Sequence, residues 1–275
     1  MSGKLYVVGT PIGNLSDFSP RAVETLASVD FIAAEDTRVT LKLLNHFEIK
    51  KPMVSYFEHN RRERGEIILE RIKSGESCAI VTDAGMPAIS DPGEDLVNLC
   101  LLNEIAVESV PGPTAFATAV AMSGLPSGRF TFEGFLSVNK PSRRDHLEEI
   151  VSERRTMVFY EAPHKLTATL KDLYKYLGDR RIALIKELTK IHETVERTTL
   201  SEACEKYSVQ TPKGEFVIVI EGSTEPKQKE VSLDEAVALA KGLVENGMAI
   251  NDAAKEIAKE TKLKKGDIYK ALLGE

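Results

Sequence analysis

Two aspartates, two prolines and two glycines lie within residues 83–93, which read DAGMPAISDPG. This segment follows the apolar run Cys78–Val81, which is typical of a buried strand. Ligands of open α/β sheets bind at the carboxyl ends of the strands. Proline stiffens a loop there, and glycine lets a ligand approach the backbone. We therefore predict a ligand-binding loop carrying Asp83 and Asp91, although the same residue types are common in ordinary turns.

Two further polar groups follow predicted strands. Glu35, Asp36 and Arg38 come directly after the predicted strand 30–34, and two carboxylates beside a guanidinium are suited to position a hydroxyl and take its proton. The alternative is a plain helix start, because acidic residues in a first turn suit the helix dipole. His59-Asn60 follows the predicted strand 53–57. Several predicted strands end in polar residues that would converge in the fold, and this convergence favours a functional site.

Several common kinds of site are not indicated. The segment Gly9–Asn14 follows the first predicted strand, but it lacks the G-x-G-x-x-G pattern, and Pro11 has no amide hydrogen to give a phosphate. Neither Ser90 nor Ser109 lies in the G-x-S-x-G turn of hydrolases. Histidines, cysteines and carboxylates do not show metal-ligand spacing, so we expect no metal. The loops that follow the predicted strands favour a ligand that is bound by backbone groups and by the shape of the loops.

Composition is that of a globular protein, with 42% hydrophobic and 28% charged residues among 275. No apolar run approaches the roughly 20 residues that cross a bilayer, and the first residues do not form a signal peptide. The three cysteines are far apart and are expected to be reduced, so we predict a cytoplasmic protein without a membrane partner. A net charge of −6 argues against nonspecific binding of polyanions, yet it leaves room for local basic patches.

Short apolar strands alternate with helices over the first 220 residues, which predicts α/β architecture with parallel strand pairs. Strands are expected at 5–8, 30–34, 53–57, 78–82, 106–110, 130–135, 157–161, 182–186, 193–199 and 215–221. The prolines and glycine at 111–113 interrupt the pattern. We therefore predict an α/β domain at 1–113, and a second α/β domain, richer in antiparallel pairs, at 114–224.

The segment after a polar linker is helical in pattern throughout. Ser232 and Glu235 match a capping box, and Asn251 is expected to cap a helix over 252–259. Three short helices at 231–275 fit a helix-turn-helix, and they fit a small docking bundle equally well.

Taken together, these segments resemble the ribosomal RNA small subunit methyltransferase I family of the tetrapyrrole methylase superfamily. The resemblance spans about residues 5 to 220. Its motifs lie at 8–15, 34–38, 83–93, 110–115, 132–136, 159–164 and 187–190. Met86 departs from the family's usual threonine, and Lys165 from its usual arginine.

The resemblance implies two α/β domains that bind S-adenosylmethionine in the cleft between them, and a homodimer. It implies 2′-O-methylation of a cytidine ribose in the decoding centre of 16S rRNA, within the small ribosomal subunit. Carried over by position, the cofactor contacts would be Pro11, Asp83, Ala84, Gly85, Met86, Ile89, Thr114, Ala115, Glu161 and Leu188.

A ribose hydroxyl is a poor nucleophile until a base accepts its proton. Our hypothesis from the sequence is that Asp36, or otherwise Glu35, is that base, and that Arg38, His59 and Asn60 orient the ribose or phosphate. The rival predictions are a tetrapyrrole or protein side-chain methylase on the same scaffold, and a nucleic-acid-binding regulator without catalysis.

Overall fold

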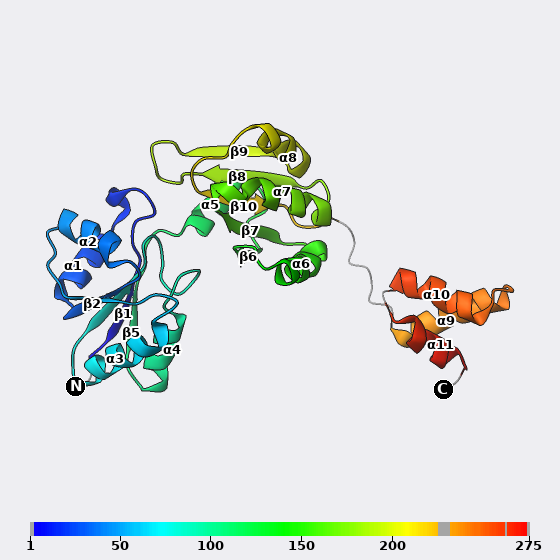
Figure 1. Ribbon diagram of the computed structural model, residues 1–275, viewed down its shortest axis with the longest axis horizontal. Helices are drawn as coiled ribbons and strands as arrows, with labels where there is room; N and C mark the ends of the chain where they lie inside the picture. The colour runs from blue at the N-terminus through cyan, green and yellow to red at the C-terminus, as the bar shows by residue number, and fades with distance from the viewer. Residues whose placement is uncertain (1–2, 225–231, 262, 274–275) are drawn as a thin grey trace. The chain divides into compact units, whose positions relative to one another are not determined.

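The computed structural model describes residues 3–224, 232–261 and 263–273. The chain divides into two compact units, Met1–Thr224 and Glu225–Glu275. The first unit holds two five-stranded sheets, and the second is helical (Figure 1).

The first sheet is parallel throughout, as the alternating pattern predicts, with strand order β3-β2-β4-β1-β5. Its strands are β1 (Leu5–Val8), β2 (Phe31–Ala34), β3 (Met53–Ser55), β4 (Cys78–Val81) and β5 (Val107–Val110). The helices that connect them are α1 (Pro20–Ser28), α2 (Thr37–His46), α3 (Arg61–Lys73) and α4 (Glu94–Leu102), and a 3-10 turn, η1 (Leu15–Asp17), precedes α1.

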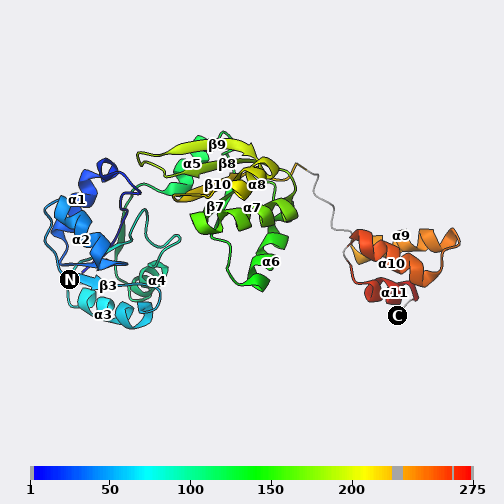
Figure 2. The ribbon, with the colours of Figure 1, turned by 45° about the horizontal axis from the view of Figure 1, so that its top comes forward.

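The connections cover both faces of this sheet. α1 and α2 pack on one face through Leu26 and Leu44, and α3 and α4 pack on the other through Ile68 and Leu96 (Figures 1 and 2). β4 lies between β2 and β1. The connection after β4 contains α4 and covers one face of the sheet, whereas the connections after β1 and β2 contain α1 and α2 and cover the opposite face. The loops therefore diverge at the carboxyl end of β4, which is where ligands bind in doubly wound sheets.

The second sheet is mixed, with order β6-β7-β10-β8-β9. β6 runs parallel to β7, and the remaining pairs are antiparallel, as expected for the second domain. Its strands are β6 (Phe130–Gly134), β7 (Thr156–Glu161), β8 (Arg181–Lys186), β9 (Thr194–Thr199) and β10 (Phe216–Ile220). Its helices are α5 (Ala115–Ser123), α6 (Lys140–Glu149), α7 (Pro163–Leu177) and α8 (Leu200–Val209), with a 3-10 turn, η2 (Ile150–Ser152), after α6.

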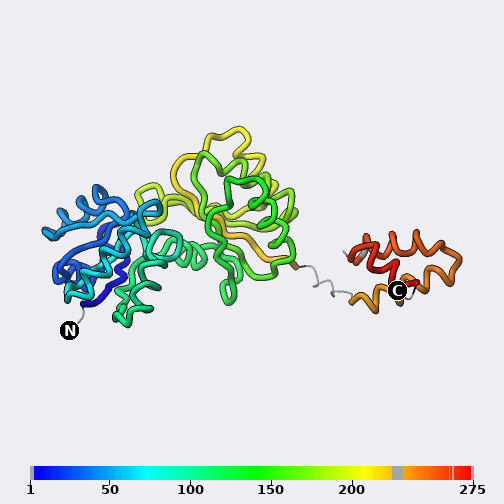
Figure 3. Tube along the Cα trace, turned by 60° about the horizontal axis from the view of Figure 1, so that its bottom comes forward, coloured from blue at the N-terminus to red at the C-terminus, as the bar shows by residue number. Residues whose placement is uncertain are grey.

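Side-chain alternation gives the second sheet two different faces. Val158 and Val217 pack against α5, whereas Phe159 and Ile218 pack against α6, α7 and α8. The backbone passes from β5 through residues 111–114 into α5 and then to the second sheet, as the tube in Figure 3 shows. A domain division at residue 113 stays a prediction, because the two sheets belong to one compact unit.

The helical unit contains α9 (Leu233–Glu245), α10 (Ile250–Thr261) and α11 (Lys265–Leu273) around a small core that includes Ala240, Ala253 and Ile257. The capping box at Ser232 is confirmed. The expected cap at Asn251 is wrong, because α10 begins at Ile250 and Asn251 lies inside its first turn. Residues 225–231, which hold most of the predicted linker and the expected start of this domain, lie outside the described residues.

The pair Ser19-Pro20 predicts a helix that begins at Pro20 with Ser19 as its N-cap, and this start of α1 is confirmed, since the Ser19 side chain accepts from the Ala22 amide at 3.1 Å. The apolar residues Leu41, Leu43, Leu44 and Phe47 predict a helix over 40–47, and α2 begins three residues earlier than that. Its N-cap is Asp36, whose carboxylate accepts from the Arg38 amide at 2.8 Å. The helix-start explanation of this acidic group is therefore correct for Asp36.

Candidate active site

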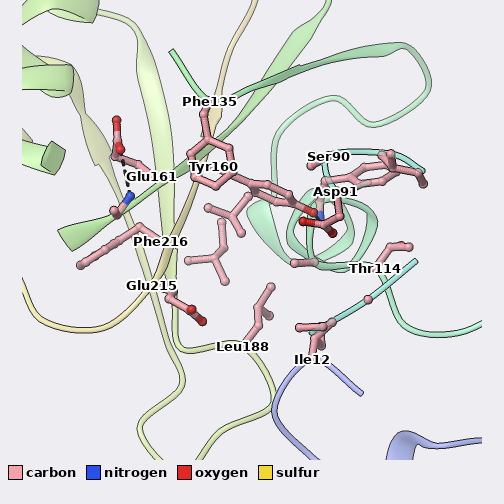
Figure 4. Close-up of a pocket in the computed structure, with 18 of the residues that line it drawn as sticks. Ile12, Ser90, Asp91, Thr114, Phe135, Tyr160, Glu161, Leu188, Glu215 and Phe216 are labelled. Atoms are coloured by element: carbon pink, nitrogen blue, oxygen red, sulfur yellow. Dashed lines mark hydrogen bonds between the residues drawn. The ribbon is translucent and has the colours of Figure 1, made fainter. Parts of the chain in front are cut away.

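A cavity of about 390 Å³ lies within the first compact unit, lined by segments of both sheets (Figure 4). That volume is in the range of sites for small organic ligands. Its lining residues are Ile12, Ala84, Gly85, Met86, Ile89, Ser90, Asp91, Thr114, Ala115, Phe116, Phe135, Tyr160, Glu161, Ala162, Pro163, Ile185, Leu188, Glu215, Phe216 and Val217.

The loop after β4 is the predicted ligand-binding loop, and it forms one wall of the cavity. It is fastened to the loop after β1 by two backbone hydrogen bonds between Thr10 and Gly85, of 2.9 and 3.1 Å. The Thr10 hydroxyl also donates to the Thr82 carbonyl at 3.1 Å. Ala88 has a φ of 66°, a strained value for a residue with a side chain. The loop therefore holds a fixed, partly strained conformation.

Glycine is required where the loop after β1 meets the loop after β5. A Cβ placed on Gly9 would lie 2.6 Å from the Gly112 nitrogen and equally close to the Met86 sulfur. The Gly112 amide donates to that sulfur at 3.3 Å. Because the two backbones touch directly, the loops after β1, β4 and β5 form a single rigid floor.

The second sheet contributes an aromatic wall. The Phe116 amide donates to the Tyr160 hydroxyl at 3.1 Å, and Phe135 packs edge-on against Tyr160 with ring centroids 5.5 Å apart. Phe135 nevertheless leaves 57% of its surface exposed. Burial raises the pKa of the Tyr160 hydroxyl, with Asp91 contributing less, so this group stays protonated.

Glu161 is a carboxylate buried to 3% exposure at the end of β7. It accepts from the Ala162 amide at 2.9 Å, drawn as a dashed line in Figure 4, and from the Thr169 hydroxyl on α7. Thr169 in turn accepts from Arg143 on α6 at 2.9 Å. Alternation along β7 directs this carboxylate toward α7, on the opposite face from Tyr160.

Leu188 lies between two residues with left-handed backbone, Glu187 and Thr189, whose φ values are 54° and 64°. The Glu187 carboxylate accepts from the Glu215 amide at 3.0 Å and from the Lys190 ammonium at 3.1 Å. These contacts stabilise a conformation that is otherwise unfavourable and hold Leu188, which is 5% exposed, against the cavity.

The structure brings together eight of the fifteen site residues predicted from the sequence. Those that line the cavity are Ala84, Gly85, Met86, Ile89, Thr114, Ala115, Glu161 and Leu188. Pro11 and Asp83 are not in the lining, but each is adjacent in sequence to a residue that is. The five residues predicted to be catalytic, namely Glu35, Asp36, Arg38, His59 and Asn60, are outside the lining as well.

Asp36 is already engaged within the protein. Its carboxylate accepts from the Arg38 amide at 2.8 Å, and from the guanidinium of the same residue at 3.0 and 2.6 Å. These bonds lower the pKa of Asp36 to about 2. The Arg38 side chain is 87% exposed. This pair therefore presents a cation to solvent, and its carboxylate is a weak base.

Glu35 and Asp83 exchange contacts across the ends of β2 and β4. The Asp83 amide donates to Glu35 at 3.3 Å, and the Asp36 amide donates to Asp83 at 3.2 Å. Burial is the largest cause that raises the pKa of both carboxyls, and Asp36 adds to each. Asn60 holds its own turn, accepting from the Phe57 amide at 2.9 Å, and His59 packs edge-on against Phe57.

Twelve lining residues were not predicted as site residues, although Asp91 had been singled out within its loop. The others missed are Ile12, Ser90, Phe116, Phe135, Tyr160, Ala162, Pro163, Ile185, Glu215, Phe216 and Val217. Most come from strands or helix starts of the second sheet, and no local pattern distinguishes a core residue there from a residue that faces a cavity.

Charge is distributed unevenly in this cavity. Within the part of the chain that the structure describes, its lining contains three carboxylates, those of Asp91, Glu161 and Glu215, and no lysine, arginine or histidine. A phosphate would find no cation here, whereas a positively charged organic ligand would find carboxylates and aromatic rings. Among the described residues no cluster of three or more histidines, cysteines or carboxylates is arranged to hold a metal. Every helix in residues 3–224, 232–261 and 263–273 is too short or too polar to cross a membrane.

Comparison with known proteins places the chain in a family. Residues 4–204 match the family of tetrapyrrole (corrin/porphyrin) methylases. The chain is 46% identical over 272 residues to the ribosomal RNA small subunit methyltransferase I of Synechocystis sp., covering 98% of each protein. It is 48% identical over 220 residues to the protein of the same name from Thermotoga maritima, covering 80% of this chain and 99% of that one.

The fold has solved counterparts. Uroporphyrin-III C-methyl transferase from Thermus thermophilus, crystallised with S-adenyl homocysteine, superposes with a TM-score of 0.57 at 19% identity, covering 79% of this chain and 97% of that one. The two-sheet unit described above thus has the architecture of tetrapyrrole methylases, as the sequence predicted. On the family match and the close relatives together, this chain belongs to the tetrapyrrole methylase family and, within it, to the ribosomal RNA small subunit methyltransferase I group.

Proposed function

We propose that the protein binds S-adenosylmethionine in this cavity and transfers its methyl group to the ribosomal RNA of the small subunit. The observation that carries the proposal is the charge of the lining, which has three carboxylates, four aromatic rings and no cation. S-adenosylmethionine is a sulfonium cation attached to a nucleoside. It needs apolar surface for its base, and aromatic faces or carboxylates near its positive sulfur.

The residues present fit such a ligand. Tyr160, Phe116 and Phe135 offer aromatic surface, and the floor formed by the loops after β1, β4 and β5 offers backbone groups at close range because glycine occupies position 85. We propose that the eight predicted residues in the lining are the cofactor contacts, with Pro11 and Asp83 acting from directly behind them. When bound, the cofactor supplies an activated methyl group on sulfur.

The substrate proposal rests on the relatives, which are named as methyltransferases of small subunit ribosomal RNA. We propose the finer assignment that the acceptor is the 2′-hydroxyl of a cytidine ribose in the decoding centre of 16S rRNA. The chain's task is then to hold this hydroxyl in line with the methyl group, which can contribute about 7–11 kcal/mol, and to accept its proton.

Outside the cavity, we propose that Arg38 contacts an RNA phosphate. Its guanidinium is 87% exposed, and the double contact with Asp36 fixes its direction. Asp36 then acts through Arg38. Its role as the base, proposed from the sequence, is disfavoured by the low pKa of its carboxyl. The contributions of His59 and Asn60, the homodimer and the cytoplasmic location stay predictions.

One experiment tests this function directly. Purified protein is incubated with radiolabelled S-adenosylmethionine and with small ribosomal subunits from cells that lack the modification, and the methylated nucleotide is then mapped. We expect a single labelled cytidine with the methyl group on its ribose. Label on another RNA, on a protein or on a tetrapyrrole, or no label at all, would contradict the proposal.

A further inference from the structure

The three carboxylates in the lining of the cavity differ in whether they accept a hydrogen bond from a donor within the protein. Glu161 accepts from the Ala162 amide at 2.9 Å and from Thr169. Glu215 accepts from the Lys190 ammonium at 2.8 Å. Each of these two carboxylates therefore has a donor within the protein.

Asp91 has none. Within the described residues no hydrogen bond or ion pair involves its carboxylate, although it is partly buried in the cavity wall. The titratable groups that face it are Asp83 on its own loop, Glu35 at the end of β2 and Tyr160 on β7, and none of them is a cation. Figure 4 shows Asp91 on the same wall as Ser90, toward Tyr160. A partly buried carboxylate without a donor is costly unless a ligand supplies one.

We propose that Asp91 is the group that accepts the proton of the substrate hydroxyl. This inference rests on the proposed function and names the base of that same reaction. The hydroxyl oxygen forms the new bond to the methyl carbon, the carbon–sulfur bond breaks with its electron pair passing to sulfur, and the hydroxyl proton passes to the Asp91 carboxylate. Charge balances, because a sulfonium and a carboxylate become a neutral thioether and a neutral carboxylic acid.

The other carboxylates nearby are less suited to this task. Asp36 already accepts three hydrogen bonds from Arg38, and neither it nor Glu35 is part of the cavity lining. Asp83 accepts from the Asp36 amide. Asp91 alone among these four both reaches the cavity and keeps its acceptor oxygens free of protein donors within the described residues.

Electrostatics supports the same assignment. Burial raises the pKa of the Asp91 carboxyl, and the negative charge of Asp83 raises it further. A carboxylate of raised pKa is a stronger base at neutral pH. Because only its ionised form accepts a proton, the rate of methyl transfer should fall as the pH falls through this pKa.

The test compares Asp91→Asn with Glu35→Gln, the competing assignment, and with Glu94→Gln. Glu94→Gln removes one charge from the exposed first turn of α4, outside the cavity lining. For each protein, calorimetry measures the affinity for S-adenosylmethionine and for S-adenosylhomocysteine. Single-turnover transfer to unmodified small subunits is followed against pH at saturating cofactor, and thermal unfolding is recorded at pH 7.

We expect Asp91→Asn to bind S-adenosylhomocysteine within about twofold of the parent and S-adenosylmethionine within about fivefold, because the variant lacks one of the three lining carboxylates that favour the positive sulfur. Its single-turnover rate should fall by about 10²-fold or more and lose its acid limb. We also expect its unfolding temperature at pH 7 to be unchanged or higher. The reason is that a raised folded-state pKa means that ionised Asp91 destabilises the fold above its unfolded pKa, and asparagine removes that charge. Glu94→Gln should match the parent in cofactor affinity, rate and pH profile, and its unfolding temperature should fall only slightly because the first turn of α4 loses one favourable charge.

The failures can be told apart. A parent protein that methylates no ribosomal RNA overturns the proposed function and the role of Asp91 with it. An active parent whose Asp91→Asn variant keeps the parent's rate and acid limb overturns the role of Asp91 alone, as does loss of the limb in Glu35→Gln but not in Asp91→Asn. A variant that binds cofactor more weakly but transfers at the parent's rate when saturated would make Asp91 a binding residue and overturn the proposal.

Discussion

Replacing Thr169 by valine should show how much a residue behind the cavity lining contributes to the stability of the fold and to cofactor binding. Thr169 is 1% exposed, and its hydroxyl connects Arg143 on α6 with Glu161 at the cavity. Valine has nearly the same shape, so the change removes the hydroxyl without opening a cavity. The Glu161 carboxylate keeps one donor, the Ala162 amide at 2.9 Å, and Arg143 keeps Asp172 at 2.7 Å.

The expected loss in the free energy of unfolding follows from the two charged groups that lose a hydrogen-bond partner. Hydrogen bonds to charged groups contribute about 1.5–3 kcal/mol each, and the loss is larger where the charged partner is buried. Glu161 is buried, whereas Arg143 retains the Asp172 carboxylate, so we expect a total loss of about 2–4 kcal/mol, most of it from Glu161. For a unit of this size, 1 kcal/mol shifts the midpoint by roughly 2–4 °C, so the unfolding temperature should fall by roughly 5–15 °C.

Calorimetry should detect a second effect, a weaker affinity for S-adenosylmethionine, because the Glu161 oxygen that has lost the Thr169 hydroxyl will turn toward another donor. The matched control is Thr167→Val on the same helix, where the hydroxyl donates only to the Tyr207 carbonyl at 3.0 Å. It should cost about 0.5–1.5 kcal/mol and leave cofactor affinity intact. If both variants unfold at the same temperature and bind equally well, the reasoning about Glu161 is refuted.

Three further outcomes can be checked with the same assays. Gly9→Ala should destabilise the protein by about 1–3 kcal/mol, measured by urea unfolding, because the new Cβ would lie 2.6 Å from the Gly112 backbone; an unchanged midpoint would show that these loops can separate. Arg38→Ala should weaken binding of small subunits and reduce its salt dependence while cofactor affinity stays the same, and Asp36→Asn should do so to a smaller degree; a variant that loses cofactor binding instead would move Arg38 into the cavity. Removing residues 225–275 should leave calorimetric cofactor binding in place, since the cavity lies wholly in the first compact unit, and a truncated protein that folds but does not bind would contradict that location.

Local sequence determined much of this fold. Alternating apolar strands and helices predicted the parallel sheet, and Ser19-Pro20 and Ser232 predicted two helix starts that the structure confirms. The segment 83–93 was identified as a ligand loop from its own composition, and it lines the cavity through Ala84 to Met86 and Ile89 to Asp91. Such features can be read from sequence because caps, turns and strand periodicity depend on residues that are close along the chain.

Tertiary structure decided the chemistry of the carboxylates. Asp36 is paired with Arg38 only two residues along the chain, whereas the pKa values of Glu35, Asp83 and Asp91 are raised chiefly because folding buries these carboxyls, and among the described residues Asp91 has no donor. The aromatic wall was likewise invisible, since the direction of Tyr160 is set by which face of the second sheet α5 covers. Solvent exclusion and contacts between distant segments set both properties, and neither is encoded in any short stretch of the chain.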